Sequence, residues 1–245
     1  MFSCSELRRE ARRVLGGAQP SCLTFVSFSL LVSAVLNVLD VVCSGVTYDD
    51  LAASGIAGLF VYILTLLISL LLEAGRVEYC GAALRGEGAS YGDLFCGFSY
   101  VFRFLSVMLA QAFLVALGFC FFFVPGLLLL YRYRFALYIL CEDPTQGAAA
   151  ILRRSATELQ GYKAQLLRLD LSFLPHALLC LIPATLWQLA PEAVYAALPL
   201  PLLSLIGTAT TLPYLLLTFW RTEAELLMRD RILAAREPKS PPVLP

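Results

Sequence analysis

Histidine and lysine are almost missing from this sequence, and charged residues of either sign are scarce. Only 15% of the 245 residues are charged, 16 of the 18 basic residues are arginine, and His176 is the sole histidine. One histidine excludes a histidine-rich metal site and leaves any catalytic triad dependent on a residue beside Pro175 in an apolar run. A packed histidine is the simpler interpretation. We therefore expect no enzymatic activity, no metal and no cofactor.

Motifs of reactive cysteine and of phosphate binding are missing as well. The eight cysteines form no CxxC pair and are spread over apolar runs, which is typical of small buried apolar side chains. The glycine-rich segment 81–98 follows no strand and precedes no Lys-Ser or Lys-Thr, so it predicts an ordinary loop and no phosphate site. The sequence gives no indication of nucleic acid as a partner.

Apolar residues are what the chain has in abundance. They make up 59% of it, and the mean hydropathy is +0.77, values far from those of a soluble domain. Uncharged runs recur near the length of about 20 residues that a bilayer core requires. The sequence predicts an all-α, polytopic transmembrane helical bundle in a single domain, 1–245, with the lipid bilayer as its partner and a flexible tail at 237–245. The expected spans are 22–43, 51–73, 104–124, 126–141, 169–190 and 197–220.

The distribution of basic residues predicts the orientation of these spans. Arg8, Arg9, Arg12 and Arg13 precede an apolar run that is too long for a cleaved signal, so we expect a signal anchor after a short interfacial helix over 5–15. The loops after the first and fifth expected spans carry acidic residues and no basic one, whereas the other loops and the C-terminal segment are basic. Because basic loops stay inside, both termini are expected in the cytoplasm.

The same rule makes the middle of the chain cross the membrane twice or dip in and return. Pro125-Gly126 is the expected reversal point, joining the third span to the fourth. The return leg, 126–141, is short for a span, so two interpretations stay open: six spans with a short fourth, which we favour, or four spans and a re-entrant hairpin.

Arg132 and Arg134 stand inside this return leg and form a candidate anion or ion-pair site with Asp170. Charges at membrane depth require protein, water or an opposite charge around them. The acidic candidates are Asp40, Glu73, Glu142 and Asp170. Snorkelling of both arginines to the headgroups is the alternative. Two residues apart on a helix, they point about 160° from each other, so one should be buried, and this would be Arg132 if Arg134 snorkels. Glu73 and Arg76, one turn apart, form a candidate interfacial pair.

A connector helix is expected over 144–160. Asp143 suits its N-cap, Pro144 its first position and Gly161 its left-handed end. Ala148, Ile151, Leu152, Ser155 and Leu159 share its apolar face, and Arg153, Arg154 and Glu158 lie off that face. The helix is expected on the cytoplasmic side, along the membrane surface or under the bundle.

The sequence between Pro125 and Phe173 also carries a resemblance. PG, YRYRFALYIL, EDP, LRRS, LQGYK and LDLSF follow one another there, and Leu212-Pro213-Tyr214 comes later. This series resembles the signature of a bacterial integral-membrane family known as domain of unknown function 975. The resemblance implies a multi-span fold in the bacterial inner membrane and no known activity. Many members have small polar residues where this chain has Arg132 and Arg134, so it implies no role for those two.

Three classes of function are compatible with these features. We favour a non-enzymatic accessory or envelope-homeostasis factor, with other membrane proteins as candidate partners, because the chain has basic amphipathic flanks and no catalytic cluster. A small transporter or channel for an anionic or lipid-like substrate is the alternative, indicated by the intramembrane arginines and by Pro175, Pro183 and Pro213 within spans. An intramembrane enzyme ranks last.

Overall fold

The computed structural model describes residues 3–44, 55–189 and 199–236, and this part of the chain is helical without any strand. The order of elements confirms the all-α bundle. They are α1 (Cys4–Gly17), α2 (Cys22–Ser44), α3 (Gly55–Arg85), the 3-10 helix η1 (Tyr91–Tyr100), α4 (Val101–Phe121), α5 (Phe123–Arg132), α6 (Ala136–Glu142), α7 (Ala148–Glu158), α8 (Lys163–Gln188), α10 (Leu200–Ala209) and α11 (Leu212–Arg236).

Membrane-spanning capacity is the main property of these helices. Five of the described helical segments are long and apolar enough to cross a bilayer, and there are six when α10 and α11, bent by 40° at a short break, count as one span. The expected residues 51–54, 190, 197–198 and the tail 237–245 lie outside the described part of the chain. The protein is therefore a helical membrane protein of about six spans.

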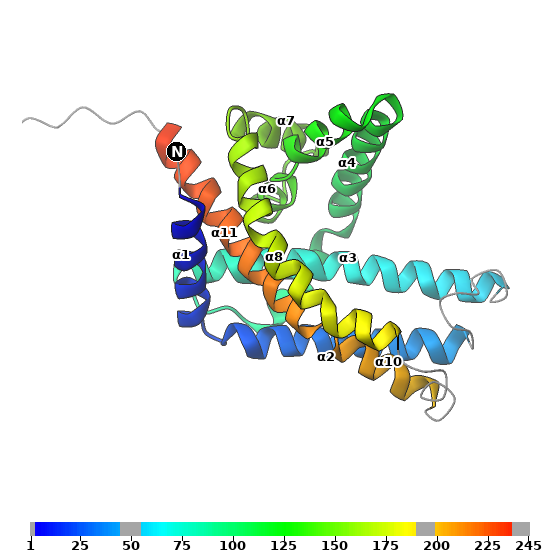
Figure 1. Cartoon of the computed structure of the whole chain (residues 1–245). Helices are drawn as coiled ribbons and strands as arrows, with labels where there is room; N and C mark the ends of the chain where they lie inside the picture. The colour runs from blue at the N-terminus through cyan, green and yellow to red at the C-terminus, as the bar shows by residue number, and fades with distance from the viewer. Residues whose placement is uncertain (1–2, 45–54, 190–198, 237–245) are drawn as a thin grey trace, which may run out of the picture.

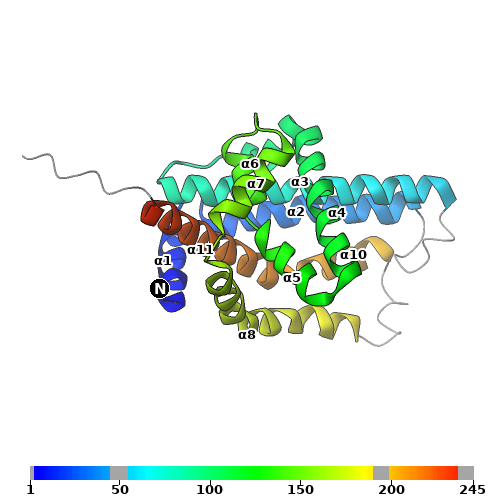
Figure 2. The same cartoon turned by 90° about the horizontal axis from the view of Figure 1, so that it is seen from above.

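Helix α11 is the element around which the bundle is built. It contacts α1, α2, α3, α7 and α8. Figures 1 and 2 show α2 and α3 lying lengthwise and α11 and α8 crossing them obliquely, while α1 lies across one end, close to the last turns of α11. The sequence predicted the last span to end at residue 220 and a flexible tail from residue 237. Helix α11 itself continues without a break to Arg236, and residues 222–229 are buried.

The segment from 81 to 98, predicted as a loop, is largely helical. Helix α3 continues to Arg85, and a capping box between Ser90 and Asp93 starts η1, which folds back along α3. Two glycines permit this contact: a Cβ on Gly75 would lie 2.3 Å from the Leu94 carbonyl oxygen, and one on Gly97 would lie 2.8 Å from that of Leu71. These glycines therefore serve close backbone packing.

The chain reverses three residues before the expected Pro125-Gly126 corner. Helix α4 ends at Phe121, and Phe122 is extended, with φ −162° and ψ 155°. Pro125 falls in the first turn of α5, where a helix needs no N–H from it, so proline starts the return leg and does not break it. Gly126 sits against Gly118 of α4, since a Cβ on Gly118 would lie 3.0 Å from the Gly126 Cα. The hairpin of α4 and α5 runs across α3, as Figures 1 and 2 show.

The connector between α6 and α8 begins with a turn. Asp143 Oδ1 accepts hydrogen bonds from the Thr145 N–H at 3.0 Å and from its hydroxyl, and Oδ2 accepts one from the Gln146 amide. These bonds close a turn, so the helix starts at Ala148, four residues later than predicted. Gly161, with φ +88°, ends the connector as expected.

The inner face of α7 is close to the predicted one. Ile151, Leu152, Ser155 and Leu159 are buried, and Ala148 is half-buried. Glu158 was placed off this face, and that placement is wrong because the residue is buried, with only 5% of its surface exposed. The helix therefore packs under the bundle on a face that includes a charge.

We expect Gly75→Ala to lower the thermal stability of the purified protein, because its Cβ would overlap the backbone of η1. Overpacking of this kind costs about 1–3 kcal/mol. Gly17→Ala is the matched control, since a Cβ there meets nothing within 4 Å. Thermal unfolding in detergent compares the two. Equal melting temperatures for both variants would contradict the close contact of η1 with α3.

We expect the turn at Asp143 to weaken in acid. The hydrogen bonds from Thr145 and Gln146 hold the pKa of Asp143 below its usual value. A lowered folded pKa means that the stabilisation is present above the unfolded pKa, about 3.9, and is lost as pH falls through the folded value. Carboxyl-carbon NMR titration measures this pKa. In Asp143→Ala the Thr145 amide should exchange faster while the amides inside α7 keep their rates; uniform loss of protection along α7 would show instead that Asp143 caps the helix.

Candidate functional site

A buried carboxylate, Glu225 of α11, is contacted by two arginines and a tyrosine. Its side chain is only 1% exposed. Arg134, in the break between α5 and α6, donates to it twice, from Nε at 3.2 Å and from Nη2 at 3.0 Å. The Tyr138 hydroxyl donates at 2.5 Å and Arg221 Nε at 3.0 Å. A two-point guanidinium contact fixes orientation as well as charge, so Glu225 anchors the α5–α6 break to α11.

Arg221 extends this contact to a second carboxylate. Its Nη2 lies 2.8 Å from Asp170 Oδ1 on α8, and the Tyr131 hydroxyl of α5 donates to Asp170 Oδ2 at 2.9 Å. Arg134, Glu225, Arg221 and Asp170 thus form one chain of two positive and two negative groups, which we call the inner network. It balances its own charge, as groups at membrane depth must.

A cavity of about 290 Å³ opens beside the inner network, between α5, α8 and α11. Tyr131, Asp170 and Arg221 stand at its polar end with Thr218. The remaining wall is apolar and consists of Leu167, Leu171, Phe173, Leu174, Ala177, Tyr214 and Leu217. An apolar pocket with a few converging polar groups suits an amphipathic molecule.

A second cluster lies one turn further along α11. Arg229, 6% exposed, donates to Glu158 of α7 at 2.8 Å and to Glu142 of α6 at 2.7 Å, and Arg154 donates to the same two carboxylates at 3.0 and 3.1 Å. Two arginines and two glutamates again balance. This outer network docks α7 and the end of α6 onto α11.

The residues singled out in the sequence have different places in the structure. Arg134 and Asp170 enter the inner network, but they are linked through Glu225 and Arg221. Arg132 is exposed, lies 6.0 Å from the Tyr133 ring, and makes no ion pair with any described residue. If Arg134 snorkelled, Arg132 would be the buried arginine. In the structure Arg134 is the one paired with a buried carboxylate, and Arg132 is exposed.

The remaining acidic candidates are placed apart from these arginines. Glu73 and Arg76 form an ion pair on α3, and Arg76 Nη1 donates to Glu73 Oε1 at 3.1 Å. Glu142 belongs to the outer network, and the side chain of Asp40 lies outside the described residues.

Two further expectations concern single side chains. His176 packs edge-on against Trp220, with ring centroids 5.4 Å apart, as expected for a packed histidine. The cysteines were expected to be buried, but among those whose side chains the structure describes only Cys80 is buried, and Cys120 is exposed. Exposure of a small apolar side chain to lipid carries no penalty, so a lipid-facing helix accepts it as well as a core does.

Glu225 was not singled out in the sequence, Arg221 and Arg229 were used only to predict orientation, and Glu158 was placed off the apolar face of its helix. A signal was present in their spacing. Positions 221, 225 and 229 carry +, − and + at intervals of four, which places alternating charges along one helix face. Such a face at the end of an apolar span indicates packing against other charged elements.

Fold and networks together define a polytopic α-helical membrane protein that is fastened internally by buried ion pairs. A scan against models of known families, a search of curated proteins and a search of solved structures each found no match. The resemblance to domain of unknown function 975 is neither supported nor opposed by these comparisons.

We expect Arg134→Leu to destabilise the protein strongly and Arg132→Leu to have little effect. Removing one partner of a buried pair leaves the other charge uncompensated, at a cost of about 3 kcal/mol or more. Arg134→Lys should recover only part of the loss, because lysine cannot make the two-point contact. Thermal stability in detergent is the readout for all three variants.

The double variant Arg134→Leu, Glu225→Leu is the internal control. It removes both charges, so its loss should be smaller than the sum of the two single losses. Strictly additive losses, or equal losses from Arg132→Leu and Arg134→Leu, would contradict the pairing described above.

Proposed function

We propose that this chain is a non-enzymatic accessory or envelope-homeostasis factor of a bacterial inner membrane, which acts by contacts with other membrane components. The observation that carries this proposal is the internal use of the charged groups. Glu225 accepts hydrogen bonds from Arg134 and Arg221, and Arg221 also lies 2.8 Å from Asp170. These contacts join the α5–α6 break, α8 and α11. Charged side chains that pair with one another fix the relative positions of the helices, which supports a structural role.

The hairpin of α4 and α5 supports a role in contact with other components. At its tip Phe121, Phe122 and Phe123 are each about 70% exposed, and Phe113 on α4 is 67% exposed. Aromatic side chains bury large areas in contact regions. In Figure 1 the hairpin stands above α3, with its tip directed away from α2 and α3.

A cytoplasmic location of both termini belongs to this proposal. Helix α1 and the end of α11 lie at the same end of the bundle in Figure 1, and Arg231 pairs with Glu10 between them. Arg9, Arg12 and Arg13 add basic charge there. This arrangement supports the orientation that the positive-inside rule favours.

A small transporter or channel for an anionic or lipid-like substrate is the second candidate. The observation that favours it is the cavity beside Asp170 and Arg221, which joins a charged end to an apolar wall. Transport would require the inner network to open around a moving substrate. Saturable flux into proteoliposomes that Asp170→Asn abolishes would support this candidate.

The accessory role predicts an envelope defect that depends on the hairpin tip. In the host, deletion of the gene should increase sensitivity to detergent and to cell-wall antibiotics. Wild type should restore resistance, and Phe122→Ala with Phe123→Ala should restore it poorly because the contact rings are removed. Phe102→Ala is the matched control, since Phe102 is 88% exposed but lies at the start of α4.

Photocrosslinking separates a contact surface from a merely lipid-facing one. A photoreactive residue at position 122 should give one reproducible protein adduct in native membranes, and the same residue at position 102 should give none. Full complementation by the hairpin variant, or adducts to lipid alone at both positions, would reject the proposed role.

A further inference from the structure

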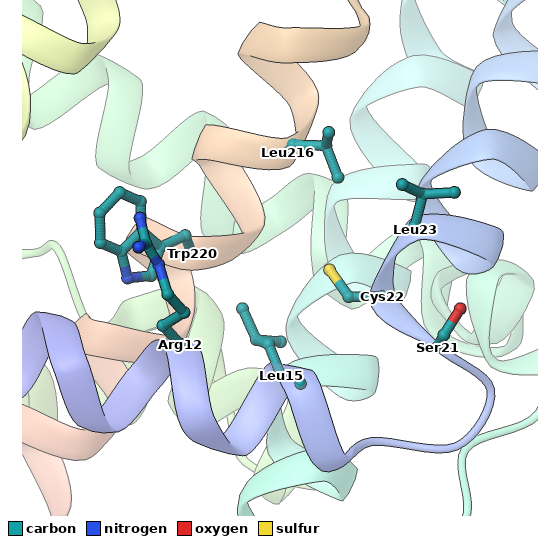
Figure 3. Close-up of a pocket in the computed structure, with 8 residues that line it drawn as sticks. Arg12, Leu15, Ser21, Cys22, Leu23, Leu216 and Trp220 are labelled. Atoms are coloured by element: carbon teal, nitrogen blue, oxygen red, sulfur yellow. The ribbon is translucent and has the colours of Figure 1, made fainter.

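A second cavity, of about 370 Å³, lies where α1 meets α2 and α11, and it shares no residue with the inner network. Figure 3 shows Arg12 and Trp220 on one side of it, Ser21, Cys22 and Leu23 on the other, and Leu15 and Leu216 between them. The lining therefore has one cationic side chain, Arg12, and is otherwise largely apolar.

Arg12 is held in a position from which it can bind an anion. Its guanidinium lies 4.5 Å from the centroid of the Trp220 ring. Figure 3 shows the two side chains together on one side of the cavity. Trp220 is itself fixed, because its Nε1 donates to the Arg8 carbonyl at 2.8 Å and Phe173 packs edge-on against it. A guanidinium stacked on a ring leaves its N–H edge free to donate. Arg12 is exposed, and within the described residues it has no acidic partner.

The charge of α1 adds to that of Arg12. Leu7, Ala11 and Leu15 face the bundle, and the opposite side carries arginines at 9, 12 and 13. Glu10 is already paired with Arg231, so it offsets little of this charge. An anion that approaches the cavity meets a positive surface.

The depth of the cavity suits a lipid. A basic amphipathic helix followed by an apolar span is the arrangement found at the level of the headgroups. Besides Arg12, the cavity is lined by Leu23 of α2, which is 60% exposed, and by Leu216 of α11. An acyl chain fits such a wall, whereas a free phosphate would leave it unused.

We propose that this cavity binds one anionic phospholipid, with its phosphate on the Arg12 guanidinium and an acyl chain along Leu23 and Leu216. The site goes beyond the accessory role and does not depend on it. It would fasten α1 to the bundle through a molecule that only a membrane with anionic lipids supplies.

The test measures binding of dioleoyl phosphatidylglycerol to the full chain in detergent, by native mass spectrometry and by the lipid-induced rise in melting temperature. Phosphatidylcholine and inorganic phosphate are the comparison ligands. Arg12→Ala should weaken phosphatidylglycerol binding roughly fivefold, the ratio that about 1 kcal/mol per arginine at a lipid surface gives. Arg13→Ala is the matched control, because Arg13 is exposed on the same helix and does not line the cavity.

Arg12→Lys keeps the charge but loses the stacked guanidinium, so its affinity should fall between those of Arg12→Ala and the wild type. This partial recovery guards against a loss caused by misfolding. Equal weakening by Arg12→Ala and Arg13→Ala would overturn the site in favour of a diffuse surface charge. Equal binding of phosphatidylcholine would also overturn it, as would a shift produced by inorganic phosphate alone.

Discussion

The burial of charge along α11 is the constraint on which this structure depends. A carboxylate as enclosed as that of Glu225 cannot stay ionised in an apolar surrounding without counter-charges and hydrogen bonds. It receives them from Arg221 on its own helix and from Arg134 and Tyr138 on other segments. Because these donors must converge, the positions of α5, α6 and α11 relative to one another follow from one residue. Apolar packing alone would allow such helices to slide or rotate.

The two networks attach different segments to one face of α11. The inner network joins α8 and the α5–α6 break, and the outer network joins α6 and α7. The break itself has a purpose in this arrangement. On a continuous helix Arg132 and Arg134 would point about 160° apart with no freedom to adjust. The turn at residues 133–135 directs Arg134 towards Glu225 and leaves Arg132 exposed, so the interruption of a short membrane leg serves the ion pair.

Hydropathy predicted α2, α4 and α8 closely, because a long uncharged run has few alternatives in a membrane. The inner face of α7 and the turn at Gly161 also followed from local rules. The errors concern charged residues, which can contact either water or each other, and proline, which can either end or start a helix. The charges of Arg221 to Arg236 were used only to predict orientation, since composition does not distinguish charges that meet water from charges that meet each other. Pro125 was taken as a corner although proline also starts helices. Arg132 and Arg134 were recognised as costly and Asp170 as a candidate partner, but Glu225 and Arg221, which link Arg134 to Asp170, lie beyond the expected end of the last span.

The distance along the chain between Arg134 and Glu225, 91 residues, has a consequence for biosynthesis. The arginine leaves the ribosome and enters the bilayer long before its carboxylate is made. Until α11 is synthesised, Arg134 in the return leg lacks the carboxylate with which it pairs in the folded protein. The final helix therefore supplies the partner of Arg134, and a chain that stops before residue 225 would leave this arginine without it.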